Sequence, residues 1–429
     1  MRRSPAPLRG LLAVLTLAGA AAACTDEAPT LTGDEFFPGG SRPVTLEAIV
    51  PASQFLTLRD VFTGYTNQNS AGFLVVANQF EAALNANALL RFSGFPDQVS
   101  YTQDGSARLD PYAAGPGKVV LKLDSLASAG VAINLQLYRV AQNWDATTAS
   151  WEMAIDSGAV HTPWTQPGGT RGALVANAVY ARTGADSVVF NIDSATVEAL
   201  RDSASTGLLL ASADPNTRVQ VTGITLRTVG HPRNATRDTT IAVNVTSGPQ
   251  TFIFTPAPPQ PAGTMQAGGI YSARTIFDLN LDQPLPGCAP PQACAAVRLS
   301  DVLLNRVSLL LRPVDVPDGF DPLTRLPITV RTVPEPGLGR RAPLGQSVVD
   351  VSSDATRLVY LAKTDTVLDV PITAYAQRIA NGDTVPTTFA LLSEDVVATS
   401  APPTFGVGVF AGTPRLRIVY TLPVRPRLP

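Results

Sequence analysis

Few side chains in this sequence have the types and spacing that catalysis requires. The chain contains two histidines, His161 in AVHTPWTQPGG and His231 in VGHPRN, and neither has a nearby partner for a metal site or a charge relay. The sequence has no G-x-S-x-G motif, no H-E-x-x-H motif and no glycine loop that would cradle a phosphate. We therefore interpret both histidines as surface or turn residues, and we expect no enzymatic activity and no cofactor.

Three acidic residues in DVPDGFDP are close enough in sequence to offer oxygen ligands to a calcium ion. They are Asp315, Asp318 and Asp321, and their spacing differs from that of the EF-hand loop. The preferred interpretation is a solvated turn without a metal, and a calcium site is the alternative.

Cys24 lies where the cleavage of a secretory signal should leave it. Residues 1–23 begin with basic residues and continue with a short apolar run, a pattern that is typical of a signal peptide. The apolar run is too short to favour a transmembrane helix. The residues before Cys24 resemble a bacterial lipobox, which predicts lipidation of this cysteine; the alternative is an ordinary signal peptide with an incidental cysteine. Residues 24–43 are polar and rich in glycine and proline, so we expect a flexible tether.

Thr25 occupies the position where an inner-membrane retention signal would favour aspartate. By resemblance to enterobacterial lipoproteins, this implies an outer-membrane lipoprotein on either the periplasmic or the cell-surface face. The membrane would then be one partner of the chain, through the lipid anchor.

The other two cysteines, Cys288 and Cys294, lie together in GCAPPQAC. An exported chain meets an oxidising compartment, so the pair predicts a local disulfide that closes a proline-rich loop. A zinc site is excluded because no histidine or further cysteine lies nearby.

Aromatic side chains are the candidates for sugar binding, because their faces can stack on pyranose rings. They include the three tryptophans and several tyrosines: Trp144, Trp151, Trp164, Tyr138, Tyr180 and Tyr112. Tryptophan is usually mostly buried, so we expect Trp144 and Trp151 to close one end of a core. Trp164 follows Pro163 in a loop rich in glycine and proline, which predicts an exposed ring. We therefore place any ligand site at Trp164, with Tyr180 and Tyr112.

The elements that would position these residues are mostly β-strands. Short apolar runs with period-two alternation recur along the chain, for example in VAINLQLYRV (131–140), VQVTGITLRTV (219–229) and LRIVYTL (416–422), and turn residues separate them at intervals of about ten residues. This pattern predicts an all-β fold of antiparallel, jelly-roll-like sandwiches. Helical spacing of apolar residues predicts two short helices, over 193–203 and 372–383.

Four segments of the first half resemble segments of the second half in the same order. The pairs are ALLRFSG (88–94) with ARTIFDL (273–279), VAINLQLYRV with VSLLLRPV (307–314), the strand–helix–strand segments around the two helices, and ITLRTV (224–229) with LRIVYTL. This order predicts a tandem duplication of one sandwich with one helix each, over residues 44–232 and 233–429. Chance similarity between generic strands is the alternative.

The first unit resembles the DNRLRE-type domain, a β-sandwich related to carbohydrate-binding modules of exported bacterial proteins. The resemblance rests on Leu89-Leu90-Arg91-Phe92, on LYRV followed by Trp144 and Trp151, and on Gly207-Leu208-Leu209-Leu210, and it covers most of residues 85–229. The eponymous motif is absent, and the second unit has no tryptophan. Membership implies a sandwich fold and an extracellular setting, but it does not identify a ligand.

The formal net charge is −2 with no block of like charge, which argues against nucleic acid as a partner. Two functions are then expected. The first is a tethered, non-enzymatic module that binds a polysaccharide or another envelope polymer. The alternative is a structural subunit that docks to a protein partner in an envelope complex through strand edges and loops.

Overall fold

The computed structural model describes residues 43–62, 72–127, 132–181, 186–256, 263–268, 273–288, 295–316, 318–320, 326–350, 359–360, 367–393, 406–411 and 414–422. The expected signal peptide, Cys24 and all but residue 43 of the expected tether lie outside this part of the chain. Among the described residues, no helix has both the length and the apolar character needed to span a membrane.

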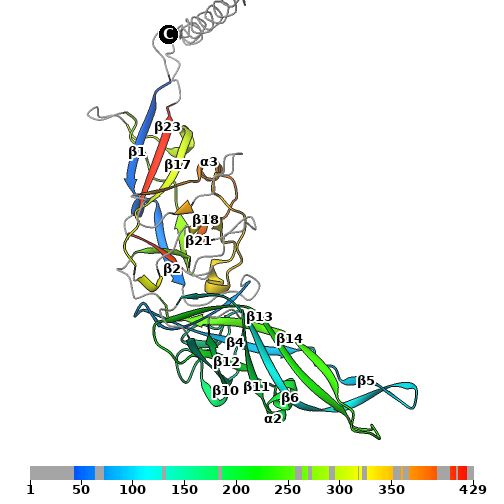
Figure 1. The fold of residues 1–429 in the computed structure, drawn as a ribbon. Coiled ribbons are helices and arrows are strands. Elements are labelled where there is room, and N and C mark those ends of the chain that lie inside the picture. Colours follow the sequence, from blue (N-terminus) through cyan, green and yellow to red (C-terminus); the bar gives the residue numbers. More distant parts are fainter. Residues whose placement is uncertain are drawn as a thin grey trace, which may run out of the picture.

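The prediction of an all-β fold is confirmed, because antiparallel strands make up most of the described chain and form two sandwiches (Figure 1). The N-terminal sandwich contains β3 (Leu74–Phe80), β4 (Leu84–Ser93), β5 (Gln98–Gln103), β6 (Ser106–Ala127), β7 (Ala132–Val140), β8 (Met153–Ser157), β9 (Val160–Pro163), β10 (Arg171–Ala181), β11 (Ser187–Ile192), β12 (Leu208–Ser212), β13 (Thr217–Pro232) and β14 (Ile241–Phe254). The C-terminal sandwich contains β1 (Thr45–Pro51), β2 (Leu56–Phe62), β15 (Met265–Gly268), β16 (Arg274–Leu279), β17 (Leu303–Leu311), β18 (Leu326–Thr332), β19 (Val359–Tyr360), β20 (Leu368–Pro371), β21 (Thr388–Ser393), β22 (Val407–Phe410) and β23 (Arg415–Thr421).

Two helices have the predicted positions, α2 at Ser194–Arg201 and α3 at Thr373–Ala380. Each begins at a carboxylate that accepts hydrogen bonds from the free amides of its first turn. In α2 the carboxylate belongs to the N-cap residue Asp193, which accepts from the amide of Thr196 at 2.7 Å. In α3 it comes from Asp350, a residue distant in sequence, which accepts from the amides of Thr373 and Ala374. The described residues also contain four short 3-10 turns: η1 (Ala52–Gln54), η2 (Leu299–Asp301), η3 (Asp318–Phe320) and η4 (Pro336–Arg341).

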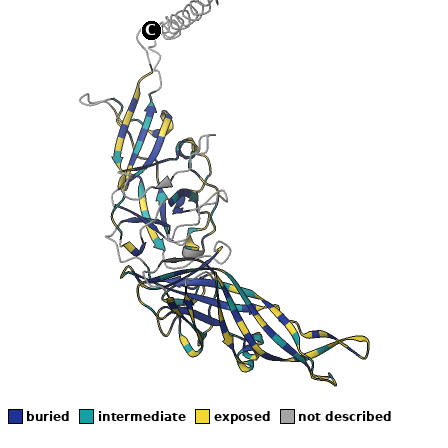
Figure 2. Ribbon diagram, in the orientation of Figure 1, coloured by how far each residue is buried: buried dark blue, intermediate teal, exposed yellow. Residues whose placement is uncertain are grey.

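The N-terminal sandwich has two layers that enclose one hydrophobic core. One layer has the strand order β10-β7-β12-β4, and the other has the order β13-β6-β11. The inward side chains of both layers alternate with outward ones, as Figure 2 shows by its banded strands. Leu135 and Leu210 from the first layer lie in the same core as Leu121 and Phe190 from the second.

The long strand β14 joins these two layers. Its first half pairs with β13, and its second half pairs with β4 in the other layer. The register shifts between Ser247 and Gln250, so the strand turns from one layer to the other at Gly248 and Pro249.

The C-terminal sandwich repeats this plan. Strand β21 lies between β16 and β18, as β12 lies between β4 and β7. Strand β17 lies between β20 and β23, as β6 lies between β11 and β13. The position of β14 is taken by β1, which pairs with β23, and by β2, which pairs with β16. The turn between them contains η1, which follows Pro51 at the end of β1.

The strand pairing therefore divides the chain differently from the expected boundary between residues 232 and 233. The leading strands of the two sequence units are exchanged: β1 and β2 precede β3 in the chain but complete the C-terminal sandwich, and β14 precedes β15 but completes the N-terminal one. Both sequence units keep the same order of elements along the chain. Because their leading strands pair with the other unit, the boundaries of the sequence repeat differ from those of the two sandwiches. The pairing partner of a strand depends on tertiary contacts that a repeat pattern does not contain.

Candidate functional site

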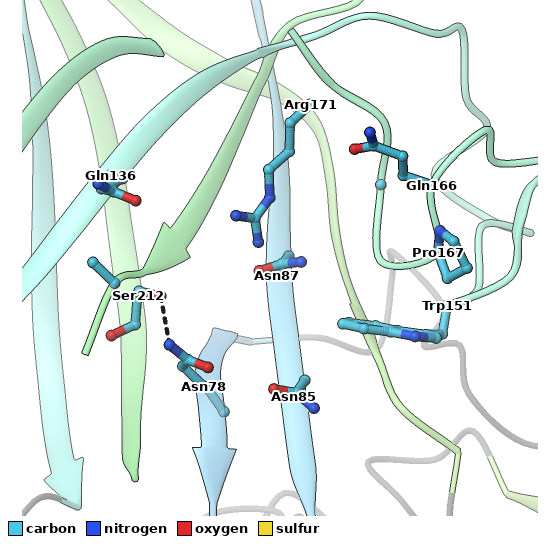
Figure 3. Close-up of a pocket in the computed structure, with 12 residues that line it drawn as sticks. Asn78, Asn85, Asn87, Gln136, Trp151, Gln166, Pro167, Arg171 and Ser212 are labelled. Atoms are coloured by element: carbon cyan, nitrogen blue, oxygen red, sulfur yellow. Dashed lines mark hydrogen bonds between the residues drawn. The ribbon is translucent and has the colours of Figure 1, made fainter. Parts of the chain in front are cut away.

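The described residues form a polar cleft on the outer face of the N-terminal sandwich, with a volume of about 580 Å³ (Figure 3). It lies over adjacent strands of one layer and beside the loop that precedes β10. The lining residues are mostly amides and small side chains: Ala77, Asn78, Asn85, Asn87, Gln136, Trp151, Gln166, Pro167, Gly169, Arg171, Ser212 and Ala213.

Strand alternation explains why polar side chains meet at this face. On β4, Leu84, Ala86 and Ala88 point into the core, so Asn85 and Asn87 between them point outward. On β7, Gln136 likewise lies between the core residues Leu135 and Leu137. Strand β12 lies between β4 and β7, and β10 pairs with the far side of β7. The outward positions of neighbouring strands thus form one polar floor.

A long segment between β7 and β10 packs over the rest of this face and forms a second, smaller core. Its tryptophans Trp144 and Trp164 are 2% and 5% exposed and contact outward residues of the sheet such as Leu209. The indole nitrogen of Trp144 donates to the carbonyl oxygen of Thr206 at 2.7 Å, and that of Trp164 donates to the carbonyl oxygen of Ser150 at 2.9 Å. Both rings are therefore structural.

Trp151 belongs to the same segment, but its side chain is only half-buried and forms one wall of the cleft (Figure 3). Gly168 fixes it. The amide of Gly168 donates to the carbonyl oxygen of Trp151 at 2.7 Å, and a Cβ atom at Gly168 would lie 2.6 Å from the indole Cη2. The φ of Gly168 is +85°, a conformation that favours glycine.

Two side chains hold the loop that carries Gly168: Asn87 on β4, and Gln142, which follows the end of β7. The side-chain amide of Asn87 donates to the carbonyl oxygen of Gly168 at 2.7 Å, and Asn87 is 4% exposed. The side-chain oxygen of Gln142 accepts from the amide of Thr165 at 3.1 Å and from the hydroxyl of Thr170 at 2.8 Å. These bonds hold the loop, and with it the wall of the cleft, against the strands.

The amides of the floor are partly satisfied by the protein. Asn78 donates through Nδ2 to the carbonyl oxygen of Ser212, and Asn87 donates through Nδ2 to Gly168, so both retain Oδ1 as an acceptor. Asn85 accepts through Oδ1 from the amide of Gln79, and Gln136 accepts through Oε1 from the hydroxyl of Tyr138. Each of these two retains an amino group as a donor. The cleft thus offers a ligand both donors and acceptors.

Arg171 is the charged residue among those that line the cleft. Its guanidinium lies over the ring of Tyr138, 5.2 Å from the centroid, and Figure 3 shows it directed toward Asn87. Within the described residues no carboxylate pairs with it.

The structure places the predicted ligand residues elsewhere. Trp164 is buried, which contradicts the expected exposed ring, because the loop folds back so that the ring fills the outer core. Tyr180 is 9% exposed and Tyr112 is 1% exposed, and both pack in the main core. The rings of these three residues therefore do not form a binding surface. Burial raises the pKa of the Tyr112 hydroxyl, and Arg201 stacks on its ring at 4.2 Å.

The prediction that Trp144 lies in a core is confirmed, and the same prediction for Trp151 is only partly met. Sequence reasoning did not single out Asn85, Asn87, Gln136 and Arg171. The available signal was their outward position in alternating strands, as in LNANALL and INLQLYRV. Most solvent-facing strand positions are polar, so this signal does not distinguish a site from an ordinary surface.

The remaining candidates take structural or surface positions. His161 is exposed on the β8–β9 hairpin, where its Nδ1 lies 2.7 Å from Oδ1 of Asp156. His231 lies half-buried on β13. Cys288 is disulfide-bonded, and its expected partner Cys294 lies outside the described residues.

No group of three or more potential metal ligands occurs in the described part of the chain, which does not include Asp321. Asp318 begins η3, the short turn that also contains Phe320. The ring of Phe320 packs into the core of the N-terminal sandwich, so this turn contributes to the contact between the two sandwiches.

A second hollow of about 730 Å³ lies near the end of α2. Its two arginines already bind main-chain oxygens: Arg91 donates to Trp144 at 3.0 Å, and Arg201 donates to Tyr112 at 3.1 Å. Arg91 also lies 4.5 Å from the centroid of the Trp144 ring. These contacts brace the fold, so the amide-lined cleft is the better candidate site.

No family model matches the chain, and no curated protein matches it. Among solved structures, a "putative secreted protein" from Parabacteroides distasonis aligns over 87% of this chain and 99% of its own, with 9% identity and a TM-score of 0.20. The empty particle of cowpea mosaic virus aligns over 81% of this chain and 92% of its own, with 9% identity and a TM-score of 0.13. Likenesses at these scores carry no argument about fold or function.

Proposed function

We propose that this protein is a non-enzymatic envelope lipoprotein whose N-terminal sandwich binds a glycan in the amide-lined cleft. The observation that carries the proposal is the combination of one half-buried indole with several amides that keep an unused donor or acceptor. Concave sites with an aromatic wall and a few oriented polar groups are typical of small-ligand binding.

Sugar hydroxyls both donate and accept hydrogen bonds, and this cleft presents both kinds of group. The Oδ1 atoms of Asn78 and Asn87 accept, and the amino groups of Asn85 and Gln136 donate. Trp151 supplies an apolar ring for the C–H face of a pyranose. The amides are neutral at every physiological pH, so these contacts do not depend on a titration.

The strand exchange suits a tethered protein. The tether expected over residues 24–43 leads into β1, which belongs to the C-terminal sandwich and pairs with β23. In Figure 1 these two strands lie at the end of that sandwich remote from the N-terminal one. An anchor at Cys24 would therefore hold the C-terminal sandwich near the outer membrane and present the cleft away from it.

Affinity electrophoresis of the chain from residue 44 onward against a panel of neutral and acidic polysaccharides tests the glycan proposal. We expect retardation by at least one polymer and a loss of about tenfold in affinity for Trp151→Ala, which corresponds to about 1.4 kcal/mol. Leu109→Ala is the control, because Leu109 is a 64% exposed apolar residue that does not line the cleft. Retardation by no polymer, with a native circular dichroism spectrum, would reject the proposal.

Fractionation tests the anchor separately. Cys24→Ala should move the full-length protein from the membrane fraction to the soluble fraction, and persistence in the membrane would show that the anchor is wrongly placed.

One observation favours the alternative role in a protein assembly. Strand β10 forms an edge of its layer, and its residues Leu174 and Val179 are 51% and 62% exposed. Exposed apolar residues on an edge strand are a common route to pairing with another chain. A photo-crosslinker at Val179 should capture a protein partner in native envelopes if this role holds, and recovery of the monomer alone would argue against it.

A further inference from the structure

The charge of the cleft identifies a class of ligand. Twelve residues line the cleft, and Arg171 is the one ionised side chain among them; no aspartate, glutamate or lysine is included. A cleft that holds one cation and no anion attracts a ligand with negative charge, although the chain as a whole has a net charge of −2.

Arg171 is available for such a ligand. Within the described residues no carboxylate pairs with its guanidinium, which lies over the face of Tyr138, 5.2 Å from the ring centroid. Stacking on an aromatic face holds the planar guanidinium while leaving its N–H groups at the rim free to donate.

A chain of contacts fixes this arrangement. The hydroxyl of Tyr138 donates to Oε1 of Gln136 at 2.7 Å, so the ring beneath Arg171 is itself held by a residue of the cleft floor. The guanidinium, the Tyr138 ring and the Gln136 amide therefore keep a fixed relation to one another across β10 and β7.

Two acidic residues directly follow lining residues in the sequence, Glu152 after Trp151 and Asp214 after Ala213, and neither forms an ion pair with Arg171 within the described residues. The side chain of Glu152 is exposed. The carboxylate of Asp214 accepts from the main-chain amide of Asn134 at 2.6 Å and from the side-chain amide at 3.1 Å. Both bonds hold it to β7.

We infer that the cleft selects acidic glycans, with the carboxylate of a uronic acid bound by Arg171 while the sugar ring lies against Trp151. A guanidinium donates two parallel N–H bonds to a carboxylate, a geometry that a neutral sugar does not provide. The amides of Asn85, Asn87 and Gln136 then bind the hydroxyls. This inference rests on the proposed glycan function and adds the charge of the ligand to it.

The test compares one polymer in two charge states. Polygalacturonate and its methyl ester share the same backbone, and the ester removes the carboxylate charge. The chain from residue 44 onward should bind polygalacturonate at least about tenfold more tightly than the ester, and Arg171→Gln should remove this difference. Arg237→Gln is the matched control, since it removes the same charge at an exposed position between β13 and β14 that does not line the cleft.

Each outcome has a separate meaning. Equal binding of both polymers by the wild-type chain would overturn the acidic preference and leave the glycan function standing, as would an unchanged preference in Arg171→Gln. Binding of neither polymer, together with no retention on the neutral polymers of the panel, would reject the glycan function itself. Loss of binding in Arg237→Gln to the same extent would show a general charge effect and would also overturn the assignment to Arg171.

Discussion

The amide of Gly168 donates to the carbonyl oxygen of Trp151 across 2.7 Å, and the carbonyl oxygen of Gly168 accepts from the side chain of Asn87 at the same distance. One glycine thus connects the aromatic wall of the cleft to its amide floor. The loop has little freedom at this point, because a Cβ atom at Gly168 would meet the indole ring at 2.6 Å.

Gly168→Ala should displace the indole of Trp151 and weaken glycan binding by about tenfold. A non-glycine residue at this φ and this contact also costs about 1–3 kcal/mol of folding free energy. Chemical denaturation and a glycan titration measure the two effects. Gly158→Ala is the matched control, since nothing lies within 4 Å of the added Cβ. An alanine at 168 that changes neither property would contradict the assigned role of this glycine.

Asn87→Ala removes the bond between the floor and the loop. The carbonyl of Gly168 is buried, so losing its donor should cost about 1–3 kcal/mol. Hydrogen exchange followed by mass spectrometry should show faster exchange in the loop from Thr165 to Thr170. Asn177→Ala on the outer edge strand should leave the same peptide unchanged. Unaltered exchange in Asn87→Ala would show that the loop is held by other contacts.

The exchange of leading strands predicts a specific crosslink. Glu47 on β1 is in register with Val419 on β23, and cross-strand Cα atoms lie about 4.5–5.5 Å apart, within the range of disulfides. Glu47→Cys with Val419→Cys should therefore form a disulfide within one chain, identified by peptide mapping.

The control for this crosslink combines Glu47→Cys with Arg227→Cys. Arg227 lies on β13, the strand that corresponds to β23 in the other sandwich, so this pair should stay reduced. A disulfide between residues 47 and 227 would mean that each unit keeps its own leading strand. A disulfide between residues 47 and 419 of two chains would mean exchange between copies.

Asp193 predicts a pH dependence of stability. Its carboxylate accepts hydrogen bonds from Thr196, and these bonds hold its pKa below the ordinary value for aspartate. A lowered folded-state pKa stabilises the protein above the unfolded-state pKa, and the contribution is lost as the pH falls through the folded-state value.

Asp193→Asn keeps an acceptor at the N-cap but cannot titrate. In urea denaturation at a series of pH values, the free energy of unfolding of this variant should therefore fall less than that of the wild type as the pH drops below the ordinary aspartate pKa. Asp238→Asn, at an exposed position, should follow the wild-type curve. Identical slopes for wild type and Asp193→Asn would exclude a contribution from this cap.

Local pattern was sufficient to predict much of the fold. Alternating apolar residues predicted the antiparallel strands, and the stripe around Val197 and Leu200 predicted α2, because these features depend on neighbours in sequence. Of the four repeat matches, three join corresponding strands. The fourth compared β7 with β17, whereas β17 has the pairing position of β6. Similar apolar alternation in both strands hides this difference.

The site was less accessible to prediction. Trp151 and Trp164 both follow turns in polar surroundings, and only the path of the loop decides which ring fills the outer core. Asn87, Gln136 and Arg171 come from three strands, and their meeting depends on a strand order that the sequence does not reveal. The exchange of β1–β2 with β14 was hidden for the same reason.

Oxidative footprinting of the tryptophans tests the central claim, that the cleft beside Trp151 binds a glycan. All three tryptophans of the chain are described, and Trp144 and Trp164 are buried while Trp151 is half-exposed, so Trp151 should be oxidised first. Saturating polygalacturonate should slow the oxidation of Trp151 and leave the other two rings unchanged. Oxidation of Trp151 at the same rate with and without bound polymer would contradict the account.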